Sequence, residues 1–431
     1  MKKYDSILSS MAIQQLTPDI AREKTVIIRT DFNVPLTHKA GKTTVADDRR
    51  IGNALQTIQT VIEAKGKAII ISHLGRPKNK PDDKLSLRPV AEKLERLLDK
   101  PVKFASDCVG EVTENSVAQL QPGEVLVLEN LRFHEGEKKN HVGFAKQLAA
   151  HADIYVNEAF STAHRSHASI VGIPKYLPSY AGLDFIKEVE SLAQLMEKPK
   201  RPFVMVIGGA KISDKVAAVE HLTKIADVVL VGGGVANNFL KADGIDIEKS
   251  YVQDVPAGEK KLSSYIEVAD DLIQQTRHER MLKDGYIPLP KIIYPIDVIA
   301  AHSPESTKTK TIEFFTQDYT EYKGNGDMFL DIGPQTTRLF RELILQAGTV
   351  FWNGPMGVFE QDAFATGTRE VAQAVAKTTA VTILGGGDTL SAIKNFGLEG
   401  RFDHVSAAGG AALEFLSGKV LPGVKVLKAK K

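Results

Sequence analysis

Basic side chains recur just after the short apolar runs in the first half of the chain, at Arg50, His73, Arg76, Arg132 and Arg165. In an open parallel sheet the carboxyl ends of the strands meet at one edge, so these side chains can converge there. Guanidinium groups match carboxylate and phosphate oxygens with paired hydrogen bonds. The recurrence therefore predicts a pocket for a small, multiply charged anion, although any one of these residues alone could be an ordinary surface charge.

Two polar residues directly follow the first apolar run. Arg29 comes immediately after this run, and Asp31 and Asn33 lie two and four residues after Arg29. A carboxylate and an amide beside arginines can orient the guanidinium groups or accept a hydrogen bond from a ligand hydroxyl. We expect them to complete the anion pocket.

The second half has a different pattern, in which glycine clusters follow the apolar runs at 208–209, 232–234 and 385–387. Glycine lets backbone N–H groups approach phosphate oxygens, and the start of a following helix adds a favourable dipole. None of the clusters matches a P-loop or a dinucleotide fingerprint, and a glycine triplet alone is more often a tight turn. The clusters suggest a phosphate site without defining it.

Charged residues adjoin two of these clusters. Lys211 and Lys215 are four residues apart at the start of an expected helix, where they could share one face toward phosphates, although exposed helix lysines are common. Asp388, beside Thr389, offers a hard oxygen ligand of the kind that Mg²⁺ takes while it bridges nucleotide phosphates. A magnesium-bound nucleotide is the expected ligand.

The elements that must position these residues follow from the apolar runs, each succeeded by a turn and an amphipathic stretch. In the first half the runs are 26–28, 68–71, 125–128 and 154–156, with helices expected at 54–64 and 90–98. The second half restarts at 203–207, 228–231, 292–293, 350–351 and 381–384. The pattern predicts an α/β protein with two doubly wound parallel-sheet domains and a cleft between them.

One helix is expected to connect the two domains. Phe185, Val189, Leu192 and Met196 recur at helical spacing, and Asp184 is placed to cap the start. The proline-containing run 198–202 ends the pattern. The alternative is an ordinary surface helix that belongs to one domain.

Composition excludes several classes of protein. With 431 residues, 43% of them apolar and 25% charged, the chain has the composition of a water-soluble protein of two or more domains, with neither a signal peptide nor a membrane span. The net charge of +2 gives no overall attraction for nucleic acid. The single cysteine, Cys108, cannot form an internal disulfide, and no Cys or His cluster has zinc-ligand spacing. We expect a cytoplasmic protein.

Eight segments resemble motifs of the phosphoglycerate kinases, in the same order and over nearly the whole chain. They are RTDFNVP at 29–35, SHLGRP at 72–77, ENLRF at 129–133, AHR at 163–165, GGAKISDK at 208–215, DIGP at 331–334, WNGPMGVFE at 352–360 and GGGDT at 385–389. Several are long enough to be highly specific. The resemblance implies a monomeric glycolytic enzyme that transfers a phosphoryl group between 1,3-bisphosphoglycerate and Mg-ADP, giving 3-phosphoglycerate and Mg-ATP.

The resemblance also implies roles for particular residues. The triose would be bound by Asp31, Phe32, Asn33, Arg50, His73, Leu74, Gly75, Arg76, Arg132 and Arg165. The nucleotide would be bound by Gly209, Lys211, Lys215, Gly233, Asn353, Glu360, Gly386, Gly387, Asp388 and Thr389, with Asp388 also holding Mg²⁺. Catalysis would fall to Arg50, Lys211 and Lys215.

The same resemblance implies domain bounds and a mechanism. Residues 1–184 with the C-terminal segment 406–431 would bind the triose, 185–201 would connect, and 202–405 would bind the nucleotide. The acceptor in the reverse reaction is a carboxylate that is already ionised, so positioning and charge stabilisation suffice without a protein base. Domain closure would bring the two ligands into line and expel water.

Two alternatives come from other classes. A dinucleotide-dependent oxidoreductase would need a fingerprint that the chain lacks. A non-catalytic relative that only binds nucleotide must be weighed because some residues depart from the family pattern: Glu158, Ser161, Asp327, Phe329, Ala407 and Ala408. The two alanines would lie where a helix start faces the transferred phosphoryl group. The triose ligands and both lysines are intact, which favours an active enzyme.

Overall fold

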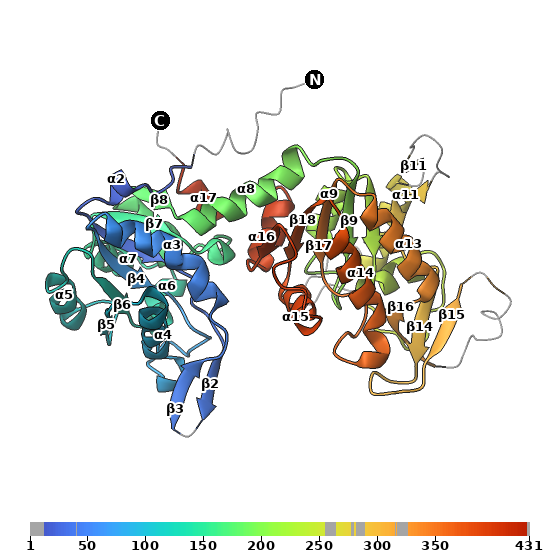
Figure 1. The fold of residues 1–431 in the computed structure, drawn as a ribbon, viewed down its shortest axis with the longest axis horizontal. Coiled ribbons are helices and arrows are strands. Elements are labelled where there is room, and N and C mark those ends of the chain that lie inside the picture. The colour runs from blue at the N-terminus through green and yellow to red at the C-terminus, as the bar shows by residue number, and fades with distance from the viewer. Residues whose placement is uncertain are drawn as a thin grey trace. The chain divides into compact units, whose positions relative to one another are not determined.

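The computed structural model describes residues 13–39, 41–254, 264–276, 280–281, 289–314, 316 and 326–428 (Figure 1). These residues form two compact units. The first consists of the described residues up to Ala193 together with those from Val420 onward, and the second runs from Gln194 to Lys419. Each unit has its own parallel sheet, which confirms the predicted fold class. No helix among the described residues is long and apolar enough to cross a bilayer.

The sheet of the first unit has six parallel strands. Their order is β5 (Val102–Ala105), β6 (Val125–Leu128), β4 (Lys67–Ile71), β1 (Thr25–Arg29), β7 (Ile154–Asn157) and β8 (Ser179–Ala181). The four apolar runs predicted in this half lie in β1, β4, β6 and β7. These strands are buried almost throughout, as is usual for parallel strands covered on both faces.

Helices and short turns connect the strands of the first unit. The α-helices are α2 (Pro18–Ala21), α3 (Arg49–Glu63), α4 (Arg88–Leu98), α5 (Glu111–Ala118), α6 (Glu135–Lys138), α7 (Val142–Ala149) and α17 (Pro422–Lys425). The short 3₁₀- or π-helical turns are η1 (Asp83–Leu85), η2 (Leu131–Phe133), η3 (Phe160–Thr162), η4 (Ala168–Gly172) and η5 (Ile173–Lys175). A hairpin of β2 (Leu36–Lys39) and β3 (Lys42–Val45) packs against α4.

The second unit combines three sheets. Its parallel sheet has the order β13 (Ile292–Ile293), β10 (Val228–Val231), β9 (Phe203–Ile207), β17 (Thr349–Asn353), β18 (Val381–Gly385) and β19 (His404–Ser406). An antiparallel sheet, which the sequence did not predict, joins β15 (Lys310–Glu313), β14 (Asp297–Ala301) and β16 (Met328–Ile332). β11 (Arg280–Met281) pairs with β12 (Leu289–Pro290).

The helices of the second unit follow its strands. They are α9 (Val216–Thr223), α10 (Gly233–Ala242), α11 (Tyr265–Thr276), α13 (Pro334–Leu345), α14 (Thr366–Lys377), α15 (Gly387–Asn395) and α16 (Gly410–Leu416), with the turn η6 (Asp362–Phe364). The structure corrects one expectation here. Lys211 and Lys215 do not share a helix face, because α9 begins only at Val216 and Lys211 lies in the preceding loop.

Helix α8 (Leu183–Glu197) contains the division between the units, which falls after Ala193 (Figure 1). The predicted helix is therefore present, and Phe185, Val189 and Leu192 are buried along it. The expected cap is wrong. Asp184 lies inside the first turn, and its backbone N–H donates to the carboxylate of Glu158, which also accepts from Phe185 N.

The chain returns to the first unit later than the expected residue 406. Strand β19 pairs with β18 in the sheet of the second unit, and α16 packs on α9. Only the residues from Val420 join the first unit, where the Gly423 N–H donates to the carbonyl of Ala163. Residues 406–419 remain in the second unit because β19 completes the edge of its sheet.

Candidate active site

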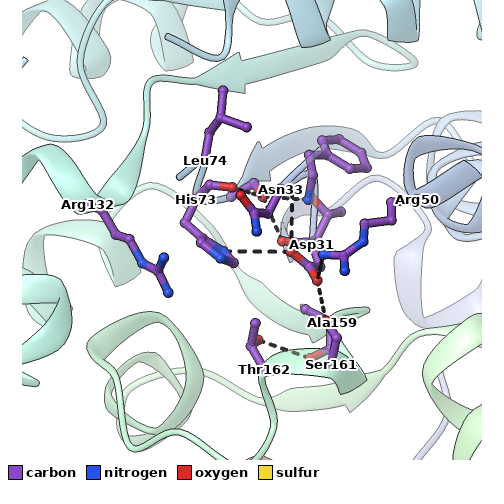
Figure 2. Close-up of polar contacts among 12 residues, drawn as sticks. Asp31, Asn33, Arg50, His73, Leu74, Arg132, Ala159, Ser161 and Thr162 are labelled. Atoms are coloured by element: carbon purple, nitrogen blue, oxygen red, sulfur yellow. Dashed lines mark hydrogen bonds and ion pairs between the residues drawn. The ribbon is translucent and has the colours of Figure 1, made fainter. Parts of the chain in front are cut away.

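Asp31 lies at the centre of a polar cluster at the carboxyl edge of the first sheet (Figure 2). Arg50, in the first turn of α3, approaches its carboxylate at 2.5 Å between Nη1 and Oδ2. Ser161 donates its hydroxyl to the same oxygen. His73 Nδ1 is 3.8 Å from the other oxygen, Oδ1. Asp31 thus orients Arg50, as its position after the first strand predicted.

His73 is held in one orientation by a residue that the predicted site omitted. The Arg29 guanidinium lies 3.1 Å from His73 Nδ1. Since a guanidinium can only donate, Nδ1 must accept, and the neutral ring then carries its proton on Nε2. Burial lowers the pKa of His73 well below its ordinary value, and the charges of four arginines lower it further: Arg29, Arg132, Arg165 and Arg50. His73 is therefore a neutral donor in a positive environment.

The remaining predicted arginines belong to the same electrostatic cluster. Burial lowers the pKa of Arg132 to about 10, and the charges of Arg165 and Arg29 add to the shift. Burial also lowers the pKa of Arg165, with Arg29 and Arg76 acting in the same direction. Arg132 Nη1 donates to the Gly75 carbonyl at 2.7 Å, while its buried Nε has no hydrogen-bond partner among the described residues. This arrangement favours an anionic ligand.

Three other predicted triose residues shape the backbone around the cluster. Asn33 Oδ1 accepts from the Gly75 N–H at 2.8 Å, which ties the loop after β1 to the loop after β4. The side chains of Phe32 and Leu74 are buried in the core of the first unit. They hold these loops against the sheet.

The structure adds functional residues that sequence reasoning missed. Arg29 is 1% exposed, and its Nε donates to the Ser169 hydroxyl at 2.9 Å. Ser169 in turn donates to the fully buried carboxylate of Glu137 at 2.6 Å. This series of hydrogen bonds fixes the guanidinium that orients His73. The available signal was the arginine that ends an otherwise apolar strand, because such a charge is rarely buried without partners.

The glycine clusters of the second unit serve two purposes. A Cβ at Gly208 would collide with the Pro355 carbonyl, and one at Gly354 would collide with the carbonyl of Gly208. These glycines let two loops pack backbone to backbone. At Gly387, which begins α15, an added Cβ would meet nothing within 4 Å. Its backbone is therefore open to a ligand, as the predicted phosphate role requires.

A cavity of about 340 Å³ lies in the second unit beside these loops. Its lining includes four predicted nucleotide residues, namely Gly209, Gly233, Glu360 and Asp388. Asn353 and Thr389 are not part of the lining but contact the loops beside it. Thr389 accepts from the Gly354 N–H at 2.7 Å, and the Asn353 side chain packs under Gly386. An apolar wall with a few polar groups is typical of a small-molecule site.

The two predicted lysines differ in their surroundings. Burial lowers the pKa of Lys215, whereas the nearby charges of Asp214 and Asp388 act in the opposite direction. Lys211 is exposed. Asp388 is an exposed carboxylate on the border of the cavity, and a single hard oxygen ligand suits Mg²⁺, which takes its remaining ligands from phosphates and water. The residues present fit the magnesium ion that the sequence predicts.

The residues that depart from the family pattern have local partners. Phe329 packs against Phe314 at 5.6 Å between ring centroids and also lines the cavity. Asp327 pairs with Lys310 at 3.9 Å. Ala408 donates its N–H to the Ser406 hydroxyl, and α16 begins only at Gly410.

The segment 406–410 thus leads into a helix as expected, but the two alanines precede its first residue, Gly410. An added Cβ at Gly409 or Gly410 would meet nothing within 4 Å. These two glycines, which adjoin the start of α16, carry the open backbone of this segment.

Comparisons with known proteins identify one family. The family model described as phosphoglycerate kinase matches residues 17–419. A phosphoglycerate kinase of Dictyoglomus turgidum is 45% identical over 424 residues, which cover 98% of this chain and 100% of the relative. The solved phosphoglycerate kinase of Coxiella burnetii has a TM-score of 0.79 at 39% identity, covering 94% of this chain and 96% of that one. The one from Pyrococcus horikoshii has a TM-score of 0.76 at 33% identity, with the same coverage. The chain belongs to the phosphoglycerate kinase family.

Proposed function

We propose that this kinase catalyses reversible phosphoryl transfer from 1,3-bisphosphoglycerate to Mg-ADP, giving 3-phosphoglycerate and Mg-ATP. The observation that carries the proposal is the convergence of positive charge around His73, where Arg29 contacts the ring and Arg50 contacts Asp31. Burial lowers the pKa of His73, and the charges of Arg29, Arg132, Arg165 and Arg50 lower it further. 3-Phosphoglycerate is a short molecule with a phosphate and a carboxylate, and guanidinium groups bind both kinds of anion with paired hydrogen bonds. The neutral His73 supplies a further donor from Nε2.

The nucleotide is assigned to the cavity of the second unit. Phe329 and the other apolar side chains of the lining favour a base and a ribose, whereas Asp388 borders the polar part. The open backbone at Gly387, at the start of the nine-residue helix α15, is suited to phosphate oxygens. Mg²⁺ held by Asp388 and the nucleotide phosphates would neutralise part of the phosphate charge.

The chain's own residues position the reactants and stabilise the charge on the transferred phosphoryl group. The carboxylate of 3-phosphoglycerate is ionised at neutral pH, so no protein base is needed. Arg50, Lys211 and Lys215 supply the positive charge. Because the triose and the nucleotide are assigned to different units, transfer requires the units to close, which also removes water that would hydrolyse the acyl phosphate.

A coupled spectrophotometric assay tests the activity. Purified enzyme is supplied with 3-phosphoglycerate, ATP and Mg²⁺, and each of the three is omitted in turn. We expect turnover that needs all three. A protein that binds ATP in calorimetry yet gives no turnover would establish the binding-only alternative raised by Glu158, Phe329 and the other departures.

We further propose that the enzyme is a monomer that acts in the cytoplasm, where glycolysis takes place. The proposal rests on the family and on each unit having its own core. Light scattering coupled to size-exclusion chromatography should give the mass of one 47.0 kDa chain. Twice that mass would refute the monomer.

A further inference from the structure

Asp107, Cys108 and His134 form a cluster away from the phosphoryl-transfer residues. Each offers one ligand atom, and the three atoms lie within 4.8 Å of one another. No other group of three His, Cys, Asp or Glu residues in the described part of the chain meets this criterion. No sequence pattern indicated this cluster, because His134 is 26 residues from Cys108 and the spacing matches no zinc motif.

The sheet brings these distant residues together. Strands β5 and β6 pair in parallel as far as Ala105 and Leu128, so the loops that follow them begin side by side. Asp107 and Cys108 lie in the loop after β5, and His134 follows the turn η2 after β6. The His134 ring stacks on Phe144 at 5.3 Å between centroids. The Thr113 hydroxyl donates to the Asp107 carbonyl at 2.9 Å, which fixes the other loop.

The donor set and its surroundings select a class of cation. A thiol sulfur, an imidazole nitrogen and a carboxylate oxygen together suit Zn²⁺ and similar borderline-soft divalent ions, whereas Mg²⁺ prefers oxygen alone. Cys108 is 1% exposed, and burial together with the negative charges of Asp107, Glu137 and Glu129 raises the pKa of its thiol well above the ordinary value. A cation that binds the sulfur therefore displaces the thiol proton. His134 and Asp107 are 33% and 44% exposed, and His134 borders a surface cavity. An ion can therefore reach the buried sulfur from solvent.

We propose that Asp107, Cys108 and His134 bind one Zn²⁺ ion, with a water molecule as the fourth ligand. Metal–ligand bonds of about 2.0–2.3 Å in a tetrahedron place the ligand atoms about 3.3–3.8 Å apart, so small side-chain movements close the site. His134 Nε2 and Asp107 Oδ1 are 2.6 Å apart and share a hydrogen bond, so the ion would replace this bond and move the two atoms apart. An ion here would join the loop after β5 to the loop that carries Arg132.

Cobalt titration gives a specific test because Cys108 is the only cysteine in the chain. Untagged, chelator-treated full-length protein is titrated with Co²⁺, and the sulfur-to-cobalt charge-transfer absorption is recorded. Zn²⁺ is then added to displace the cobalt. We expect the band to appear at one equivalent and to disappear with Zn²⁺. Its absence, or its persistence when Zn²⁺ is added, would overturn the proposal.

Variants separate the site from adventitious histidine binding. Cys108→Ser should abolish the band. His134→Phe keeps a ring to stack on Phe144 and should weaken Zn²⁺ binding in calorimetry more than about tenfold, since loss of even an outer-shell partner costs about 10–100-fold. His38→Ala, at an exposed histidine of the hairpin, is the control and should bind as the wild type does. If His134→Phe also binds Zn²⁺ unchanged, then His134 and Asp107 form only an ion pair and the proposal fails.

Discussion

Individual arginines at the sheet edge of the first unit act through their shared electrostatic field. Burial lowers the pKa of His73, and Arg29, Arg132 and Arg165 lower it further. Burial likewise lowers the pKa of Arg165, with Arg76 acting in the same direction. Like charges that are held this close repel one another, and a bound anion relieves the repulsion. Each arginine should therefore contribute to anion affinity even where it makes few direct contacts.

The first prediction concerns the strength of triose binding. Arg165→Ala should weaken the affinity for 3-phosphoglycerate by about tenfold or more, because a hydrogen bond to a charged group is worth about 1.5–3 kcal/mol. Added salt should weaken the binding of 3-phosphoglycerate to the wild type, because ions screen the charges of a partly exposed cluster. Isothermal titration calorimetry measures both effects, with Lys24→Ala at an exposed site as the control. Equal affinities for the two variants would remove the basis for the pocket.

A second prediction separates binding from catalysis at Lys211. We expect Lys211→Ala to lower kcat by about 10²–10³-fold, the usual cost of losing one group that stabilises transition-state charge. The affinity for 3-phosphoglycerate should stay nearly the same, because the triose is assigned to the other unit. Steady-state kinetics and calorimetry report the two quantities. Lys224→Ala, at the exposed lysine that follows the last residue of α9, is the control. An unchanged kcat in Lys211→Ala would contradict the assigned role.

At the scale of elements, the connecting helix depends on a buried carboxylate. Glu158 accepts from the first-turn N–H groups of Asp184 and Phe185 and from the Thr57 hydroxyl of α3 at 2.6 Å. Thr57 Oγ1 also accepts from Leu183 N at 2.9 Å. Glu158 and Thr57 therefore couple α3, which carries Arg50, to the start of α8.

Thr57→Val tests this coupling with little change in side-chain shape. Removing the hydroxyl should lower the free energy of unfolding by about 1–3 kcal/mol, because the Leu183 N–H loses its acceptor and Glu158 loses a donor. Hydrogen exchange should become faster at residues 183–185. Thr60→Val, one turn further along α3, is the matched control, since its hydroxyl bonds only within its own helix at Gln56. Unchanged protection of residues 183–185 in Thr57→Val would show that α8 does not need this link.

A second element-scale prediction concerns pH. Burial raises the pKa of Asp331, at the end of β16, to about 8, although its carboxylate accepts from Gly367 N in α14. The folded protein thus retains this proton between about pH 4 and pH 8, whereas the unfolded chain loses it near its ordinary value. The free energy of unfolding should fall as the pH rises through this window, by at most about 1.4 kcal/mol per pH unit from this group.

Asp331→Asn removes the titration and so isolates it. As the pH rises from about 4 to about 8, the free energy of unfolding of the wild type should fall relative to that of the variant. Trp352 is the single tryptophan and is fully buried, so its fluorescence reports urea unfolding of the second unit. Asp362→Asn, at an exposed carboxylate, controls for the loss of one negative charge. A difference that is constant with pH would refute the raised pKa.

At the scale of the whole molecule, the proposed assignment of the two ligands to different units predicts a motion that brings them together. We expect the radius of gyration in small-angle scattering to fall when 3-phosphoglycerate and a non-transferring Mg-ATP analogue are both present. Either ligand alone should produce a smaller change, because closure needs contacts from both. Arg165→Ala should not show this fall in radius of gyration when the concentration of 3-phosphoglycerate is too low to saturate its weakened triose site. Full compaction with the nucleotide alone would indicate that the triose is not required.

The sequence by itself predicted the parallel-strand framework and most of the residues that cluster at the sheet edge of the first unit. Long apolar runs predict buried parallel strands because both of their faces are covered, and Arg50, His73, Arg132 and Arg165 followed such runs. The motif order also indicated the family. These features are local in sequence, so a pattern can carry them.

Only the tertiary structure decided which buried groups are partners. It placed Glu158 rather than Asp184 at the start of α8, joined Arg29 to Glu137 through Ser169, and kept residues 406–419 in the second unit. It also brought His134 to Cys108 across neighbouring strands. In each case a buried polar group takes its partner from a distant segment, because desolvation must be compensated by whatever the packing brings within reach. Spacing along the chain does not record that distance.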